Sequence, residues 1–274
     1  MKYFRSLILS IGMLCILGAP SFAQEAAEDT VFGWKKEIIG TLNLTQASFN
    51  NWAQGGENTL AWQINFNSNF TLDIEKWNWA NTGKFAMGFA KIEGEEARKS
   101  ADELNLESVL TRKIGKFLSP FIAATAKTQF VSGFEYGDST KTKISGFIDP
   151  GYFTQSAGVG YYPNDNFKTR IGLMVKETVT DIFLEKSKTE AGFASVTDFK
   201  RKFSENVLFI SKLNLFSNLK AFDQIDLLWE NDLTLKVSKY INVSVEVDWL
   251  YDKDISTNQQ IRQTLAVGFT YTFL

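Results

Sequence analysis

The chain has 274 residues, with 29 basic and 31 acidic side chains, no His and a single Cys. This balance lacks the basic surplus of nucleic-acid-binding proteins, so we expect no nucleic acid partner. Zinc and copper favour imidazole and thiolate ligands, so sites for these metals are disfavoured and we expect no cofactor, although carboxylates leave calcium open.

Residues 1–23 have the pattern of a secretory signal peptide. Basic residues precede an apolar run at 7–19, and a small-x-small sequence ends at Ala23. Removal after Ala23 leaves 251 residues with a net charge of −4 and no Cys. We expect residues 24–36 to form a short periplasmic segment and residues 37–274 to form one domain.

The rest of the chain alternates between apolar and polar residues. In the stretch LAWQINFNSNFTLDI at 60–74, Trp62 and Ile64 alternate with Gln63 and Asn65. A period of two is typical of a β-strand with two different faces. The pattern predicts twelve strands, at 37–47, 60–74, 77–91, 103–116, 120–133, 152–162, 165–177, 190–202, 206–217, 222–237, 240–252 and 264–273.

The links between these strands alternate in length. Short turns are expected near 75–76, 116–119, 163–165, 204–206 and 238–239, and longer links at 48–58, 92–102, 134–151, 178–189, 218–221 and 253–261. This alternation is typical of an all-β, transmembrane, antiparallel up-and-down β-barrel. An even strand number places both termini at the rim with the short turns, which is periplasmic in such barrels.

A soluble sandwich or lipocalin-like barrel also alternates, but it turns its apolar face inward. The 24 Phe, 7 Trp and 8 Tyr favour a lipid-facing wall with aromatic girdles. The chain ends in Tyr271-x-Phe273 followed by Leu274, which resembles the C-terminal aromatic signal that barrel-assembly machinery recognises. The expected partners are therefore this machinery and the lipid of a Gram-negative cell outer membrane, with the protein a monomer.

The polar face carries charges that identify candidate lumen residues. If the turn at 238–239 sets the register, Glu230 lies opposite Asp248 and Asp232 lies opposite Glu246. Like charges in such positions repel, so cations are expected nearby. The inward candidates are Lys84, Lys113, Lys168, Arg170, Lys212, Lys236 and Arg262.

Two interpretations of these charges remain open. One is a packed lumen in which the charges neutralise one another, and the other is an acidic stripe that faces a basic one across an aqueous pore. Twelve strands fall between filled eight-stranded barrels and open sixteen-stranded porins, so the strand number does not decide.

The first long link, FNNWAQGGEN at 49–58, contains Trp52 followed by Gly55 and Gly56. Adjacent glycines permit a close backbone approach. The segment is expected either to cap the hairpin at headgroup level or to fold over the pore mouth.

Two stretches carry a family resemblance. QASFNNWAQGGEN at 46–58 and PGYFTQSAGVGYYPNDNF at 150–167 resemble an uncharacterised outer-membrane family, domain of unknown function 3078. The resemblance implies an outer-membrane barrel and no assigned activity.

An enzyme is not expected, because the familiar outer-membrane barrel enzymes depend on a His and the chain has none. The sequence therefore predicts passive permeation of small polar solutes. The alternative is a non-conducting structural or adhesive barrel whose extracellular loops bind a partner.

Overall fold

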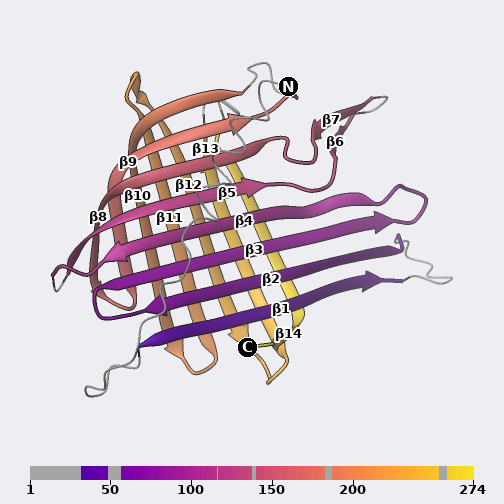
Figure 1. Ribbon diagram of the computed structural model, residues 1–274. Helices are drawn as coiled ribbons and strands as arrows, with labels where there is room; N and C mark the ends of the chain where they lie inside the picture. Colours follow the sequence, from indigo (N-terminus) through magenta and orange to yellow (C-terminus); the bar gives the residue numbers. More distant parts are fainter. Residues whose placement is uncertain (1–31, 49–56, 116, 138–139, 183–186, 253–257) are drawn as a thin grey trace.

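The computed structural model describes residues 32–48, 57–115, 117–137, 140–182, 187–252 and 258–274. Twelve antiparallel strands form a closed barrel in the order β1-β14-β13-β12-β11-β10-β9-β8-β5-β4-β3-β2, and β6 and β7 form a separate two-stranded sheet (Figure 1). The barrel strands are β1 (Gly33–Ala47), β2 (Thr59–Asp73), β3 (Trp77–Ile92), β4 (Arg98–Arg112), β5 (Leu118–Thr128), β8 (Gly151–Asn164), β9 (Phe167–Val179), β10 (Lys188–Ser204), β11 (Val207–Asn218), β12 (Ala221–Lys236), β13 (Ile241–Tyr251) and β14 (Gln260–Thr272). Among the described residues, no helix is long and apolar enough to cross a membrane.

The predicted fold class and the number of barrel strands are confirmed, and each predicted strand overlaps one strand of the barrel. The long link at 134–151 contains a hairpin that the sequence did not predict, made of β6 (Gly133–Tyr136) and β7 (Lys141–Ser145). In Figure 1 this hairpin extends beyond the end of β5.

Two of the links predicted to be long are in fact short. β4 begins at Arg98, so the link at 92–102 shrinks to residues 93–97, and β11 and β12 are joined by Leu219 and Lys220 alone. The polar sequence RKSAD at 98–102 hides the start of β4, because a register shift interrupts its alternation.

The barrel wall closes where the first and last strands meet. β1 and β14 pair from Ile39–Thr272 to Asn43–Gly268, over five residue pairs, whereas β1 and β2 pair over fifteen. β1 starts and β14 ends at the rim of the short turns, as the even strand number predicts.

The burial pattern is the reverse of that in a soluble protein. Among the described residues, only four apolar side chains are buried, whereas nine polar or charged side chains are. On β14, Leu265, Val267 and Phe269 are exposed on the outer surface, while Arg262 and Thr264 line cavities inside the barrel. An apolar exterior around a polar interior is the pattern of a barrel whose solvent is lipid.

Exposed aromatic side chains recur at the short-turn rim. They lie at the start of β1, at or next to the turns that follow β2, β4, β8, β10 and β12, and at the end of β14: Trp34, Trp77, Phe117, Tyr161, Phe203, Tyr240, Tyr271 and Phe273. Aromatic rings are favoured at the membrane–water interface, where an apolar body and a polar edge are both solvated. This ring of aromatic residues marks one boundary of the lipid-facing band.

Candidate functional site

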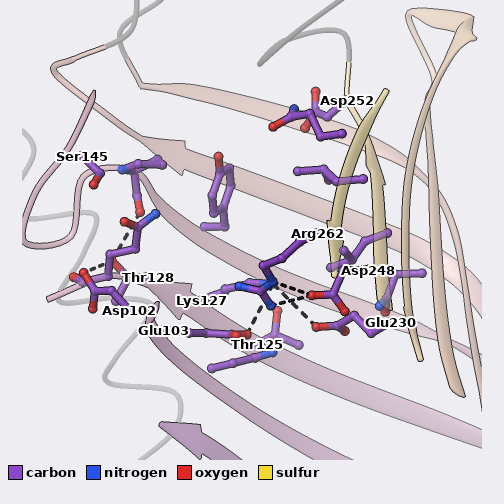
Figure 2. A pocket seen from close by; sticks show the side chains of 18 of the residues that line it. Asp102, Glu103, Thr125, Lys127, Thr128, Ser145, Glu230, Asp248, Asp252 and Arg262 are labelled. Atoms are coloured by element: carbon purple, nitrogen blue, oxygen red, sulfur yellow. Dashed lines mark hydrogen bonds and ion pairs between the residues drawn. The ribbon is translucent and has the colours of Figure 1, made fainter. Parts of the chain in front are cut away.

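The barrel encloses a cavity of about 1560 Å³. Glu96, Glu135, Tyr136 and Lys141 line it and belong to the links and the β6–β7 hairpin at the long-loop rim, so the cavity is entered from that side. We call this cavity the vestibule. Figure 2 shows acidic and basic side chains converging on it from β4, β5, β12, β13 and β14.

The lower end of the vestibule is formed by charged residues on opposite walls. Its lining ends at Glu107 on β4, Arg170 on β9 and Lys212 on β11. On these three strands, no described residue closer to the short-turn rim lines it. Every second residue of a strand points inward, so each of these side chains reaches the lumen without leaving the regular ladder.

Glu107 joins two walls of the barrel, and we call its contacts the Glu107 bridge. Its Oε1 lies 2.6 Å from Arg170 Nη2, and its Oε2 lies 2.5 Å from Lys212 Nζ. β4 and β11 are separated by four strands in the wall, so the pair with Lys212 spans the lumen. Asp198 lies 3.7 Å from Arg170 and 3.8 Å from Lys212, so two acids balance two bases.

A second group of ion pairs, the Glu103 cluster, also crosses the lumen. Glu103 lies 3.3 Å from Lys84 and 3.5 Å from Lys127, and Lys127 lies 4.0 Å from Glu230 on the far side. Figure 2 shows these carboxylates pointing towards Lys127 and Arg262. Within the described part of the chain, the lumen is therefore crossed by Glu107–Lys212 and by Lys127–Glu230.

The predicted register between β12 and β13 is confirmed. Glu230 pairs with Asp248, and Asp232 pairs with Glu246. Arg262, opposite Asp248 on β14, donates from Nε to Asp248 Oδ2 at 2.8 Å and places Nη2 at 2.5 Å from the same oxygen. Each member of the pair nearer the vestibule thus has a cation.

The next pair of the same ladder differs. Among the described residues, neither Asp232 nor Glu246 makes an ion pair within 4 Å. Asp232 accepts a hydrogen bond of 3.0 Å from Thr234. Glu246 lines a second cavity of about 20 Å³ beside Lys84 and Arg262.

Nearer the long-loop rim, Lys176 is surrounded by acids. Its Nζ lies 2.5 Å from Asp226, 3.4 Å from Glu190 and 3.7 Å from Asp252, and Lys188 lies 3.3 Å from Glu190. The ammonium group holds together the carboxylates of Glu190 on β10, Asp226 on β12 and Asp252 just after β13. Within the described ranges, no group of three or more acidic, His or Cys side chains is arranged to hold a metal ion.

Another cation, Lys99, attaches the β6–β7 hairpin to the barrel wall. Lys99 Nζ donates to Asp102 at 3.0 Å, to Gln129 at 2.7 Å and to Ser145 at 2.8 Å. Asp102 also accepts the backbone N–H groups of residues 130 and 131 at 2.9 and 2.8 Å. The chain beyond β5 is therefore held against β4 by charge-assisted hydrogen bonds.

At the rim itself, Lys141 donates to Glu96 at 2.6 Å. This hydrogen bond, with the attraction between the charges, lowers the pKa of Glu96 below 4.5. The same contact raises the pKa of Lys141 above 10.5. Both groups are solvent-exposed, so salt screens the pair.

Of the charges singled out from the sequence, Glu230, Asp248, Arg170, Lys212 and Arg262 line the vestibule, and Asp232 and Glu246 follow Glu230 and Asp248 on the same ladder. Lys168 is exposed near the short-turn end of β9, opposite Asp198. Trp52, Gly55 and Gly56 lie outside the described residues.

Sequence reasoning missed Glu103, Glu107, Lys99 and Lys176. Glu103 and Glu107 lie four residues apart on β4, and this spacing within an alternating strand was the available signal that they share a face. Both acids lie within the strand predicted at 103–116, but the sequence reasoning did not assign them to a face.

A closed antiparallel barrel with an apolar exterior, an aromatic rim and a charged lumen defines a transmembrane β-barrel. Residues 44–134 match the family described as "Protein of unknown function (DUF3078)", which confirms the resemblance based on the first long link. The matched range contains that link, and residues 150–167 lie outside it. No curated protein sequence matches the chain.

Several solved barrels are distantly similar in structure. The translocator domain of the autotransporter NalP from Neisseria meningitidis is 13% identical with a TM-score of 0.39, covering 98% of this chain and 94% of that one. An outer-membrane channel from Pseudomonas putida F1 is 9% identical with a TM-score of 0.42, covering 92% and 99%. The NanC porin is 7% identical with a TM-score of 0.40, covering 85% and 98%. Similarities this low carry no information about activity.

Proposed function

We propose that the protein is an outer-membrane barrel that conducts small polar solutes passively through its lumen. The observation that carries the proposal is the vestibule of about 1560 Å³, which opens at the long-loop rim and is lined by charged and polar side chains. Charged groups that line a cavity lose free energy of hydration if the cavity is dry, so we expect it to contain water and small hydrated solutes.

The ion pairs across the lumen set the size of the solute. In the pairs Glu107–Lys212 and Lys127–Glu230, long side chains reach towards each other from opposite walls of the barrel. They narrow the path to the gaps between side chains, so small solutes and ions pass and large oligomers do not.

The proposal is tested by recording single-channel currents from the refolded protein in a planar bilayer. The expected result is steady unitary steps of small conductance. Lys127→Ala removes one of the side chains that cross the lumen and should increase the unitary conductance, as should Lys212→Ala. Lys239→Ala is the control, because it removes the same charge from the turn between β12 and β13.

The second candidate is a non-conducting barrel whose long-loop rim binds a partner. The ion pairs that cross the lumen favour this alternative, because they obstruct the path through the barrel. The rim surface also favours it, because Arg98 stacks 4.5 Å from the Tyr136 ring and Lys141 lies 4.6 Å from the Phe134 ring. A silent bilayer from demonstrably folded protein, with both lumen variants also silent, would contradict permeation and favour this alternative.

A further inference from the structure

The lumen has an excess of negative charge. The vestibule is lined by nine acidic and seven basic side chains. Its bases are engaged: Arg170 and Lys212 hold Glu107, and Arg262 holds Asp248. The surplus is therefore acidic in a narrow space, where low-dielectric walls focus the field of the fixed charges.

We call Glu230 and Asp248 the upper acidic pair, and Asp232 and Glu246 the lower acidic pair. The surplus of acids increases at the lower pair. Asp232 and Glu246 are directly opposite each other on β12 and β13, a position that brings two side chains to a Cβ separation of about 5 Å. No basic side chain among the described residues lies within 4 Å of either carboxylate.

The nearby cations are engaged by other carboxylates. Lys84, on β3, lies 3.3 Å from Glu103, and Arg262, on β14, contacts Asp248. The neutral neighbours are also polar: Thr234 donates to Asp232, and Gln63 and Thr264 share the small cavity with Glu246. A mobile cation is therefore the group that this pair of carboxylates lacks.

From this arrangement we propose that the pathway selects cations, with Asp232 and Glu246 as the residues that determine the selectivity. The inference rests on the proposed permeation and specifies its solutes as small cations and polar molecules that carry an ammonium group. Anions meet repulsion from the surplus of carboxylates and enter less readily.

The test is the reversal potential of the refolded protein in a planar bilayer with a tenfold KCl gradient. The wild type should show a potential of the sign given by K⁺ permeating faster than Cl⁻. Each substitution removes a unit charge, which is worth about fivefold at contact distance in water, so the variant Asp232→Asn/Glu246→Gln should lower the permeability ratio of K⁺ to Cl⁻ by at least about fivefold.

Glu205→Gln is the matched control, because it removes one acid from the short turn between β10 and β11 and should leave the ratio unchanged. The single variants Asp232→Asn and Glu246→Gln serve if the double variant does not fold, and each should give part of the decrease. Folding is checked by heat-modifiable migration on a gel.

The outcomes separate the two proposals. Current without a cation bias, or a bias that survives in the folded variants, overturns the selectivity while leaving permeation intact. Silence from folded wild-type protein overturns permeation, and the selectivity with it. A cation bias that falls in the lumen variants and stays in the control supports both.

Discussion

Two successive acidic pairs of the β12–β13 ladder have opposite electrostatic environments. In the upper pair, Glu230 has Lys127 at 4.0 Å from across the lumen and Asp248 has Arg262 at 2.5 Å. In the lower pair, Asp232 and Glu246 have no ion-pair partner among the described residues. The register brings like charges together in both pairs, so the difference comes from what the other strands present at each level.

The comparison shows that neutralisation in this lumen is local. Arg262 is two residues along β14 from Thr264, the register partner of Glu246, and among the described residues this shift leaves Glu246 without an ion pair. Ion pairs in wet surroundings gain little beyond contact distance. The Glu107 bridge marks one extreme, with both carboxylate oxygens paired, and the lower acidic pair marks the other.

The largest effect is expected from breaking the Glu107 bridge. Glu107→Gln leaves Arg170 and Lys212 buried next to each other with only the more distant Asp198. Removing one partner of a buried ion pair typically costs about 3–5 kcal/mol. Urea unfolding followed by Trp fluorescence measures the loss, and Asp198→Asn should cost much less, since Asp198 is partly exposed. Equal losses in the two variants would contradict the bridge as the dominant contact.

The upper acidic pair can be deprived of a cation, which would make its surroundings resemble those of the lower pair. Arg262→Met removes the cation from Asp248 and should lower the free energy of unfolding by up to about 1 kcal/mol, because the guanidinium is half exposed. The same variant should raise the permeability ratio of K⁺ to Cl⁻. An unchanged ratio would show that the charge of this level does not reach the permeating ion.

The lower pair can be relieved of its repulsion. Asp232→Asn removes one of two opposed carboxylates, and the amide oxygen can still accept the hydrogen bond from Thr234. We expect the protein to become more stable by about 0.5 kcal/mol, the order of cross-strand charge effects. The measurement is the midpoint of urea unfolding, with Glu205→Gln in the turn between β10 and β11 as the control. A clear destabilisation would mean that the carboxylate has a partner.

The smallest effect is expected at the exposed rim pair, Glu96 and Lys141. The pKa of Glu96 lies below its usual 4.5, so the ion pair is fully formed above pH 4.5 and is lost as the pH falls through the lowered pKa. An NMR titration should find this lowered pKa and should find it restored by Lys141→Met or by 1 M salt. Glu96→Gln should leave the unfolding midpoint unchanged. A pKa of 4.5 for Glu96 in the wild type would show that the ion pair does not form in solution.

The sequence predicted the parts of this fold that depend on local pattern. Alternation defined the strands and their two faces, and the tight turn at 238–239 was sufficient to predict the pairing of Glu230 with Asp248. In a hairpin, the turn fixes the register, so neighbouring residues are determined by short-range geometry.

Contacts across the lumen could not be predicted in the same way. Glu107 and Lys212 are 105 residues apart, and whether they meet depends on the tilt of the strands and the stagger of the whole barrel. The β6–β7 hairpin was missed for a related reason, since its position depends on Lys99 reaching Ser145 from another strand. The charges were visible in the sequence, but their partners were not.

The short seam between β1 and β14 has a consequence for how the barrel is made. Its five residue pairs join the first and last strands of the wall, and Thr41 and Thr270 share a hydrogen bond of 3.1 Å across a separation of 229 residues. Closing so large a loop carries the greatest entropic cost of any ladder in the wall. We therefore expect the seam to be the last part of the cylinder to form, so that contact between these two threonines would report complete assembly.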